Sequence, residues 1–580
     1  MELNLQQKTG EIVALLEQRF VIFWKNLLLQ FFLQCLAKIS RVFNFLYGCF
    51  NLYEDTGGRS VRDRLDPKLS AVLDDEYELN ARRRHGETLV HDAVRNERLD
   101  CLIELLLSGA DLEISDDEGN APLHTAVQLN NPHLVYALIA FNAYVNVKNH
   151  SGQTPRHIAA QHEEKGADIL RALHSMGAER CNDNMTDCKD GCRCQGYYDG
   201  LPQESQFDIS DELEKVYDPF LEMTISSLRE QAEKNPPKKG EARRAETVLC
   251  LDGGGIRGLV LVLILEAIER ASDKRIVDSF DWIVGTSAGA VLAASLLHGY
   301  SLLECRRIYF DFKNELFHGS KPYDGERFLP LVKRMTRGTE AKIKDLKYNK
   351  NKLLITTTIA NRSPPALHFF RNFEAPVTSS TRIVSQAGNF KNPPPEDSRE
   401  ELAWRCIRAS CSAPTYFTPF QHYLDGGLFC NNPTNDAITE IIEYNMSLQM
   451  KGEKPPPLGA VISVGSGSAP VRGIEEISDV FPRCISDIYR ALQMLTTASN
   501  LCDIVLQTLT DTRFRPVDRS RAWCQSIGAA FFRLSPTLSK DYELCLTDNE
   551  EIVRMLWETK VYLHRNKGKF DTIGELLNKI

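Results

Sequence analysis

The sequence has no excess of basic residues. Its 580 residues include 69 Lys and Arg against 78 Asp and Glu, and the formal net charge at pH 7 is −9. A chain with this balance does not attract nucleic acid through bulk charge, so we expect no nucleic-acid partner. The sequence also contains no array of acidic loops of the kind that binds Ca²⁺, so we expect no dependence on calcium.

The sequence has no uninterrupted apolar run long enough to cross a membrane. Residues 12–50 are very hydrophobic, but only twelve uncharged residues separate Lys25 from Lys38, whereas a spanning helix needs about 20. Polar residues recur in this stretch at helical intervals: Arg19, Asn26, Gln30, Gln34, Lys38 and Arg41. We expect residues 1–50 to form an amphipathic helical segment that either packs against the protein or lies at a membrane interface. The first residues, MELNLQQ, lack the basic stretch of a secretory signal, which indicates a cytoplasmic protein.

The cysteine-rich stretch after residue 180 contains no C-x2-C pair. The 16 cysteines are spread over the whole sequence, which favours reduced thiols over a disulfide framework. Cys181, Cys188, Cys192 and Cys194 are spaced C-x6-C-x3-C-x-C, a pattern that is not typical of a tetrahedral zinc site. We therefore expect no metal and no cofactor, and we interpret residues 181–246 as a polar, charged linker.

An internal repeat begins at Gly86, Gly119 and Gly152, with a period of 33 residues. Its G-x-T-P-L-H-x-A core and the apolar run that follows resemble the ankyrin repeat, which implies a solenoid of stacked helix pairs. We place the repeats at 86–118, 119–151 and 152–180, after a linker or degenerate repeat at 51–85.

One histidine recurs in each repeat, as His91, His124 and His157. Histidine at this position of the ankyrin repeat normally bonds backbone groups, so we assign these three residues no chemistry. Arg156 stands where the repeat usually has leucine, which suggests that the third repeat is a cap or has a solvated edge.

From Thr247 onward, apolar runs (VLCL, FDWIV, LLITTTIA, GAVISVG) alternate with helical patterns. This alternation predicts an α/β domain with a central sheet flanked by helices. We place this domain at 247–438, with its C-terminal part at 439–580, and expect helices near Ile485–Leu506 and Ile552–Leu563.

The stretch DGGGIRG, Asp252 to Gly258, lies between a predicted strand and a predicted helix. Backbone N–H groups that no side chain covers at such a turn can bind either a phosphate or a developing oxyanion. Leu259 and Val260 follow where a P-loop needs Lys and Ser or Thr, so that loop is excluded. A dinucleotide motif is formally present in Gly253, Gly255 and Gly258, but no acidic residue ends a second strand at the required distance. A further turn, GSGS from Gly465 to Ser468, is expected near the same site.

A second turn, Gly285-Thr286-Ser287-Ala288-Gly289, fits the G-x-S-x-G nucleophile elbow, with a strand pattern before it and a helix pattern after it. The elbow predicts that Ser287 is exposed above the sheet as a nucleophile. Histidines after it that could act as its base are His298, His318, His368, His422 and His564, but none lies in a turn suited to that role. The best acidic partner is Asp425, which Gly426 and Gly427 follow directly.

These three motifs, in this order, resemble the signatures of patatin-like phospholipases. Ankyrin repeats before them are similar to those of the animal calcium-independent phospholipases A2 of group VI. The resemblance implies a Ser–Asp dyad without histidine, with Ser287 as nucleophile and Asp425 as base. It also implies that the amides of Gly254 and Gly255, with help from Arg257, stabilise the oxyanion. Arg257 could instead support the loop or meet the lipid phosphate.

The function that follows is hydrolysis of fatty acyl esters of glycerophospholipids, and of lysophospholipids as well, through an acyl-enzyme. A neutral-lipid lipase or transacylase on the same fold, or an ankyrin scaffold with an inert domain, are the alternatives. The expected partners are phospholipid in membranes, which the protein would reach by peripheral association, proteins bound through the ankyrin repeats, and a second copy of the chain.

Overall fold

The structure is a computed structural model that describes residues 79–182, 185–189, 191–192, 209–234, 245–317, 319, 321–336, 340–376, 398–470 and 511–580. The amphipathic segment expected at residues 1–50, the helix expected at Ile485–Leu506, and Cys194 and His318 lie outside these ranges. Within them, no helix has both the length and the apolar character that crossing a bilayer requires.

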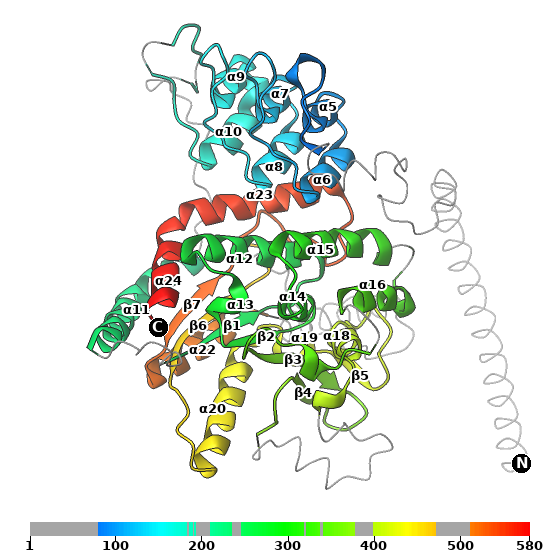
Figure 1. Ribbon diagram of the computed structural model, residues 1–580, viewed down its shortest axis with the longest axis vertical. Coiled ribbons are helices and arrows are strands. Elements are labelled where there is room, and N and C mark those ends of the chain that lie inside the picture. Colours follow the sequence, from blue (N-terminus) through cyan, green and yellow to red (C-terminus); the bar gives the residue numbers. More distant parts are fainter. Residues whose placement is uncertain are drawn as a thin grey trace, which may run out of the picture. The chain divides into compact units, whose positions relative to one another are not determined.

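Three helix pairs follow residue 79. They are α5 (Leu89–Arg95) with α6 (Leu99–Leu107), α7 (Pro122–Gln128) with α8 (Pro132–Ala140), and α9 (Pro155–Gln161) with α10 (Ala167–Ser175). The short 3₁₀ helices η1 (Arg84–Gly86) and η2 (Glu163–Gly166) precede α5 and α10. The pairs lie side by side (Figure 1) and bury leucines such as Leu102, Leu134 and Leu170 between them. Because each pair covers its apolar face with its neighbour, the pairs form an ankyrin solenoid, as predicted.

The repeated histidines differ in their contacts. His91 Nδ1 accepts a hydrogen bond from the Thr88 amide at 3.2 Å, and His91 Nε2 lies 3.0 Å from Asn120 O in the next repeat. His124 makes the equivalent contacts with the Ala121 amide at 3.1 Å and with Gln153 O at 3.1 Å. Both are therefore structural, as expected. His157 does not follow this pattern, because its Nδ1 faces cysteine sulfur atoms.

The expectation of a solvated edge at Arg156 is wrong. The Arg156 side chain is buried, with 1% of the residue exposed. Its guanidinium donates to Ala178 O and to Gly191 O, both at 2.8 Å. The arginine therefore ties the third repeat to the polypeptide that follows it, as a cap would require.

Seven strands form one sheet in the order β4-β3-β2-β1-β6-β7, with β5 also paired to β3. The strands are β1 (Glu246–Leu251), β2 (Trp282–Gly285), β3 (Lys352–Ile359), β4 (Ala366–Arg371), β5 (Tyr423–Asp425), β6 (Leu458–Val464) and β7 (Ala530–Leu534). Five neighbouring strands are parallel to one another, in the order β3, β2, β1, β6 and β7. The strands β4 and β5 run antiparallel to β3.

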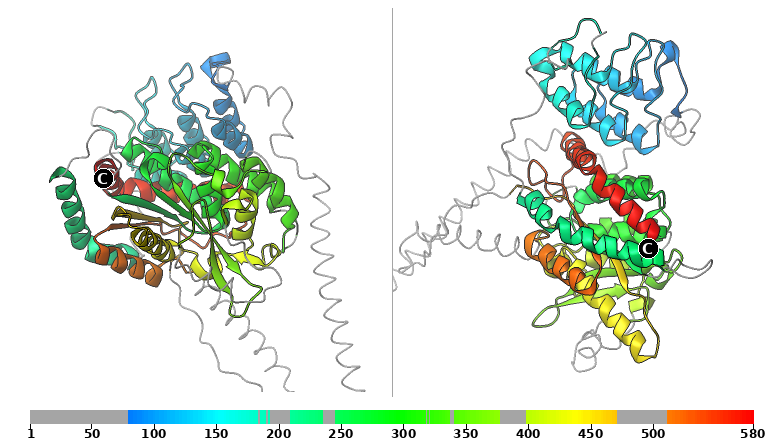
Figure 2. Two further views of the ribbon diagram at one scale, coloured as in Figure 1. Left: turned by 60° about the horizontal axis from the view of Figure 1, so that its bottom comes forward. Right: turned by 90° about the vertical axis from the view of Figure 1, so that its left-hand side faces the viewer.

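Helices cover both faces of the sheet (Figure 2). Alternate strand residues such as Leu249 and Ile283 belong to a core shared with α12 (Gly258–Ser272), α14 (Ala288–Leu297), α15 (Leu302–Leu316), α23 (Asn549–Arg565) and α24 (Lys567–Lys579). The intervening residues, such as Val248 and Val284, pack with α20 (Thr434–Met450) and α22 (Phe514–Ile527). The predicted central sheet flanked by helices is confirmed, and the helix expected at Ile552–Leu563 lies within α23.

The stretch interpreted as a linker contains a long helix, α11 (Ile209–Lys234). Ile225 and Leu228 of this helix are buried, and the helix packs near β7 and α24. The sequence of this helix is highly charged, so its few buried apolar positions were not recognised as a packed face. The remaining elements are α13 (Ile276–Ser279), α16 (Phe328–Met335), α18 (Ala403–Ser410), α19 (Gly427–Cys430), η3 (Gly255–Arg257), η4 (Gly325–Arg327), η5 (Ile343–Asp345) and η6 (Ser398–Glu400).

Ile462, fully buried at the centre of β6, tests this arrangement of the core. We expect Ile462→Ala to lower the free energy of unfolding by about 2–5 kcal/mol, because it removes buried methylene groups and leaves a cavity. Ile527→Ala is the matched control, since Ile527 is 38% exposed at the end of α22. Chemical denaturation followed by tryptophan fluorescence measures both variants. Equal losses would contradict the placement of β6 inside the sheet.

Candidate active site

Ser287 lies at the junction between β2 and α14. Its backbone has φ 52° and ψ −119°, a strained conformation for a residue with a side chain. The Ser287 amide donates to Ser410 Oγ at 2.9 Å, which helps to hold the turn. The sequence places the serine on an elbow, and the structure has the sharp strand-to-helix turn that an elbow requires.

Gly285 and Gly289 allow the polypeptide to approach itself at this turn. A Cβ atom on Gly285 would collide with the carbonyl of Gly289, and one on Gly289 would collide with the carbonyl of Leu251 at the end of β1. Both clashes involve backbone atoms, which cannot move aside as a flexible side chain can. The two glycines therefore permit a close approach that any larger residue would prevent.

Sheet register brings Asp425 to Ser287. The last residue of β2, Gly285, pairs with Ile355 of β3, and the last residue of β5, Asp425, pairs with Thr357. Because β4 occupies the other edge of β3, β2 and β5 share one edge and their carboxyl ends face each other. Residues separated by 138 positions thus become neighbours, and Ser287 Oγ donates to Asp425 Oδ2 at 2.8 Å.

The Asp425 carboxylate is buried, with 5% of the residue exposed. Burial raises its pKa to about 6, although hydrogen bonds from the Gly427 amide and the Ser287 hydroxyl oppose this shift. The Gly427 amide donates to Oδ1 at 2.8 Å, so Oδ1 is fixed and Oδ2 faces the serine. The carboxyl group is therefore a stronger base than an exposed aspartate.

The structure describes four histidines after Ser287, and none of them forms a hydrogen bond with Ser287 or Asp425: His298, His368, His422 and His564. His368 is completely buried, and burial lowers its pKa to about 3. Within the described part of the chain, the Ser287 hydroxyl donates its hydrogen bond to the Asp425 carboxylate rather than to an imidazole.

The glycine turn after β1 lies against the same cavity as the dyad, since Gly254, Gly255 and Arg257 line it together with Ser287 and Asp425. Within the described residues, the amides of Gly254 and Gly255 donate to no acceptor. Ser466 Oγ donates to Gly253 O at 2.8 Å and so supports the turn from the GSGS segment. The turn thus places two glycines, whose amides have no acceptor in the described part of the protein, at the wall that also carries the serine.

The other motif glycines allow close packing around these residues. A Cβ on Gly258 would meet the ring of Tyr309 in α15, and one on Gly426 would meet Thr356 of β3. Arg257 lies partly buried in the cavity wall, where its Nη1 donates to Asp541 Oδ1 at 3.2 Å. Burial lowers the pKa of Arg257, and the nearby Asp541 carboxylate opposes this shift.

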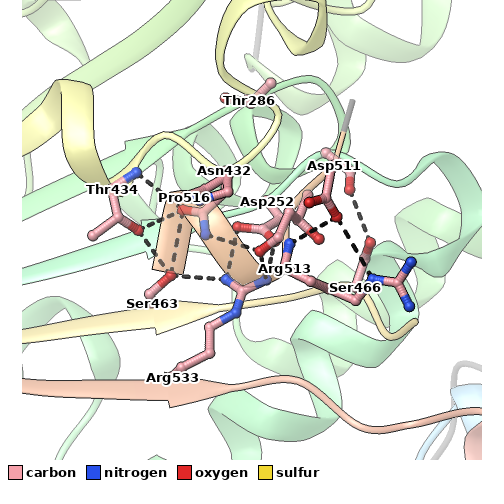
Figure 3. A network of polar contacts seen from close by, with 12 residues as sticks. Asp252, Thr286, Asn432, Thr434, Ser463, Ser466, Asp511, Arg513, Pro516 and Arg533 are labelled. Atoms are coloured by element: carbon pink, nitrogen blue, oxygen red, sulfur yellow. Dashed lines mark hydrogen bonds and ion pairs between the residues drawn. The ribbon is translucent and has the colours of Figure 1, made fainter. Parts of the chain in front are cut away.

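A buried ion pair fixes the start of the glycine turn, and the sequence did not predict it (Figure 3). Arg533 of β7 reaches across the end of β6 and donates to both carboxylate oxygens of Asp252, at 3.1 and 2.5 Å. It also donates to Ser463 Oγ at 2.8 Å and to Thr512 O at 3.1 Å. Burial raises the pKa of Asp252 to about 6, although the Arg533 charge opposes this shift. Asp252, the first residue of the DGGGIRG stretch, therefore supports the turn structurally.

The cavity beside Ser287 has a volume of about 290 Å³. Much of its lining is apolar and aromatic, including Val291, Phe312, Leu316, Phe317, Phe328, Phe417 and Leu428. An apolar cavity with a few polar groups at one end suits a ligand with a long hydrocarbon part and one reacting polar group.

The α/β domain thus combines three features: a serine on an elbow, a carboxylate that contacts it, and a glycine turn at the same cavity. Residues 249–438 match the family model of patatin-like phospholipases, and residues 73–185 match ankyrin repeats in three copies. The chain therefore contains a patatin-like phospholipase domain preceded by ankyrin repeats, as the resemblance predicted.

The chain is also similar to several proteins named as phospholipases A2. The 85/88 kDa calcium-independent phospholipase A2 of Mus musculus is 40% identical over 357 residues, which cover 61% of this chain and 43% of the relative. The protein of the same name from Rattus norvegicus is 39% identical over 357 residues, which again cover 61% of this chain and 43% of the relative. The intracellular phospholipase A2 of Caenorhabditis elegans is 29% identical over 537 residues, or 89% of this chain and 47% of the relative. The chain thus spans less than half the length of these relatives.

The Asp252–Arg533 pair can be tested by a double-mutant cycle. We expect Asp252→Asn and Arg533→Gln each to lower the free energy of unfolding by about 3–5 kcal/mol, because each leaves a buried charge without its partner. The double variant should lose clearly less than the sum of the two, as coupled neighbours do. Chemical denaturation of the four proteins gives the coupling energy.

Glu400→Gln is the control, because it breaks ion pairs with Lys342 and Lys344 that lie largely in solvent. We expect no measurable change in its free energy of unfolding. Strictly additive losses in the cycle at Asp252 and Arg533 would contradict a direct buried pair.

Proposed function

We propose that this protein is a calcium-independent lipid acyl hydrolase of the phospholipase A2 type, which cleaves fatty acyl esters of glycerophospholipids and lysophospholipids. The observation that carries this proposal is the 2.8 Å hydrogen bond from Ser287 Oγ to a buried carboxylate, in a cavity whose lining is largely apolar. The relatives named as calcium-independent phospholipases A2 support the substrate class.

In the first step, Ser287 Oγ attacks the ester carbonyl while its proton passes to Asp425 Oδ2. The protonated Asp425 then gives this proton to the leaving alcohol, and the lysophospholipid departs. The acyl group remains on Ser287 as an ester. A pKa of about 6 suits both halves of this exchange, since the carboxylate can accept a proton near neutral pH and release it again.

In the second step, Asp425 accepts a proton from water, and the resulting nucleophile attacks the acyl ester. The fatty acid leaves and Ser287 Oγ recovers its proton from Asp425. In both steps, negative charge develops on the former carbonyl oxygen. The amides of Gly254 and Gly255 are the donors that we assign to this charge, and one such donor typically contributes about 3 kcal/mol of transition-state stabilisation.

Arg257 takes a supporting role in this proposal. Its contact with Asp541 holds its guanidinium at the wall of the cavity beside the glycine turn. From there its positive charge favours both the oxyanion and an anionic phosphate at the mouth of the cavity.

Access to a lipid substrate requires contact with a bilayer, and we propose peripheral association of an intracellular protein. Phe429 supports this proposal, because 48% of the residue is exposed although the preceding Leu428 lines the cavity. The name of the Caenorhabditis elegans relative supports the intracellular placement. The ankyrin repeats are the proposed surface for protein partners, and a second copy of the chain is one candidate.

Ser287→Ala tests the proposed nucleophile. Without a hydroxyl there is no acyl-enzyme, so we expect release of fatty acid from phospholipid vesicles to fall by at least about 10⁴-fold. Asp425→Asn should fall nearly as far, because the amide is not a base. Mass spectrometry of the fatty acid and lysophospholipid products, with a calcium chelator present, measures both.

Ser526→Ala is the matched control, because Ser526 lies exposed near the end of α22 and its Oγ donates to the backbone of Trp523. It should keep the wild-type rate. Normal turnover by Ser287→Ala would overturn the proposed mechanism. Products other than fatty acid, lysophospholipid and the fully deacylated glycerophosphodiester would overturn the proposed substrate class.

The pH dependence of kcat/KM tests the proposed base. Burial favours the protonated form of Asp425 and raises its pKa to about 6, whereas the base must be ionised to accept the serine proton. We expect kcat/KM to be constant above this pKa and to fall tenfold per pH unit below it. Near-UV circular dichroism over the same range shows whether the fold persists. A flat profile down to pH 4.5 in folded protein would contradict Asp425 as the base.

A further inference from the structure

Four potential metal ligands converge at the end of the ankyrin solenoid, far in sequence from the dyad. His157 comes from helix α9 of the third repeat, and Cys181, Cys188 and Cys192 come from the polypeptide that follows the repeat. His157 Nδ1 and the three Sγ atoms all lie within 4.8 Å of one another. Cys192 is fully buried, and Cys181 and Cys188 are half-buried.

Four of the six distances between these atoms are close to those of a tetrahedral zinc site, and all six are within 4.8 Å. His157 Nδ1 lies 3.4 Å from Cys181 Sγ, 3.9 Å from Cys188 Sγ and 3.4 Å from Cys192 Sγ. Cys181 Sγ and Cys192 Sγ are 3.4 Å apart. Zinc bonds of about 2.3 Å to sulfur and 2.0 Å to nitrogen place sulfur atoms about 3.8 Å apart, and nitrogen about 3.5 Å from sulfur.

Hydrogen bonding among these groups does not account for the convergence. A neutral imidazole nitrogen offers one lone pair, and a thiol is a weak donor. Nδ1 can thus satisfy one thiol well, whereas three thiols surround it. A divalent cation at the centre would use the nitrogen lone pair and all three sulfur atoms together.

The histidine is turned away from its usual partners to face the thiols. In the first two repeats, Nδ1 of His91 and His124 accepts from a backbone amide and Nε2 contacts the following repeat. In the third repeat, Nε2 lies 3.4 Å from the Gln161 side-chain nitrogen, and that nitrogen donates to Asp187 O at 2.7 Å.

The segment carrying the cysteines is anchored on the repeat by a few polar contacts. The Cys181 amide donates to Cys192 O at 2.9 Å, and Arg156 donates to Gly191 O. These bonds hold the two ends of the segment together beside α9. They place the thiols over the last helix pair, where a further repeat would otherwise be needed to cover it.

We propose that His157, Cys181, Cys188 and Cys192 form a structural Cys₃His zinc site that closes the ankyrin solenoid. Thiolate and imidazole ligands in a closed tetrahedral set are the donors that Zn²⁺ prefers in structural sites. On binding, the three thiols release their protons to solvent, and the site carries a net charge of −1. This proposal departs from the expectation of no metal, which rested on cysteine spacing alone.

Metal analysis of the full-length protein tests the site. Protein purified under reducing conditions should contain about one zinc per chain, and Co²⁺ added to the metal-free protein should give the visible spectrum of tetrahedral thiolate coordination. Cys188→Ser should bind Co²⁺ at least about 100-fold more weakly, since loss of an outer partner alone typically costs 10–100-fold. A zinc chelator should lower the melting temperature of the wild type and leave that of Cys188→Ser unchanged.

Cys101→Ser is the matched control, because Cys101 is a half-buried cysteine of the first repeat outside the cluster. It should keep the zinc content and the cobalt spectrum of the wild type. Protein that holds no zinc and gives no tetrahedral cobalt spectrum would overturn the proposal. So would a Cys181–Cys192 disulfide that persists under reducing conditions, or a Cys188→Ser variant that binds Co²⁺ as tightly as the wild type.

Discussion

The hydrogen bond between Ser287 and Asp425 depends on one constraint, which is the pairing of two strands with the same edge of β3. The strand β2 ends at Gly285, two residues before Ser287, and β5 ends at Asp425 itself. A shift of one residue in either register would turn one side chain to the opposite face of the sheet. The buried core on both faces fixes these registers, so the packing of the whole domain determines the geometry of two side chains.

The cavity wall is built by residues from distant parts of the chain. The glycine turn after β1 contributes backbone donors, but Asp252 at its start is held by Arg533, 281 residues later in the sequence. Ser466 and Ser410 support the glycine turn and the elbow from two further segments. The α/β domain therefore needs β6 and β7, which follow the motifs, to hold the motifs in place.

The sequence was sufficient to predict what is local. Glycine spacing located both turns, the period of 33 residues located the repeats, and the alternation of apolar runs predicted a sheet flanked by helices. Asp425 could be selected because glycines follow it directly. The role of Arg533 could not be predicted, because a single arginine in a strand does not indicate its partner. The predictions for Arg156 and for helix α11 were wrong for a common reason. Their charged residues indicated exposure to solvent, whereas Arg156 and the apolar side of α11 are packed against other residues. The cysteine spacing was judged without His157, which lies 24 residues before the first of them.

The central claim is that Ser287, activated by Asp425, is the residue that becomes acylated. A fluorophosphonate, which reacts irreversibly with activated serines, tests this claim without any choice of lipid substrate. Tandem mass spectrometry of the labelled protein should find the phosphonyl group on the peptide containing Ser287, and labelling should be far slower in Asp425→Asn. Labelling at a different serine, or at an equal rate in both proteins, would contradict the account.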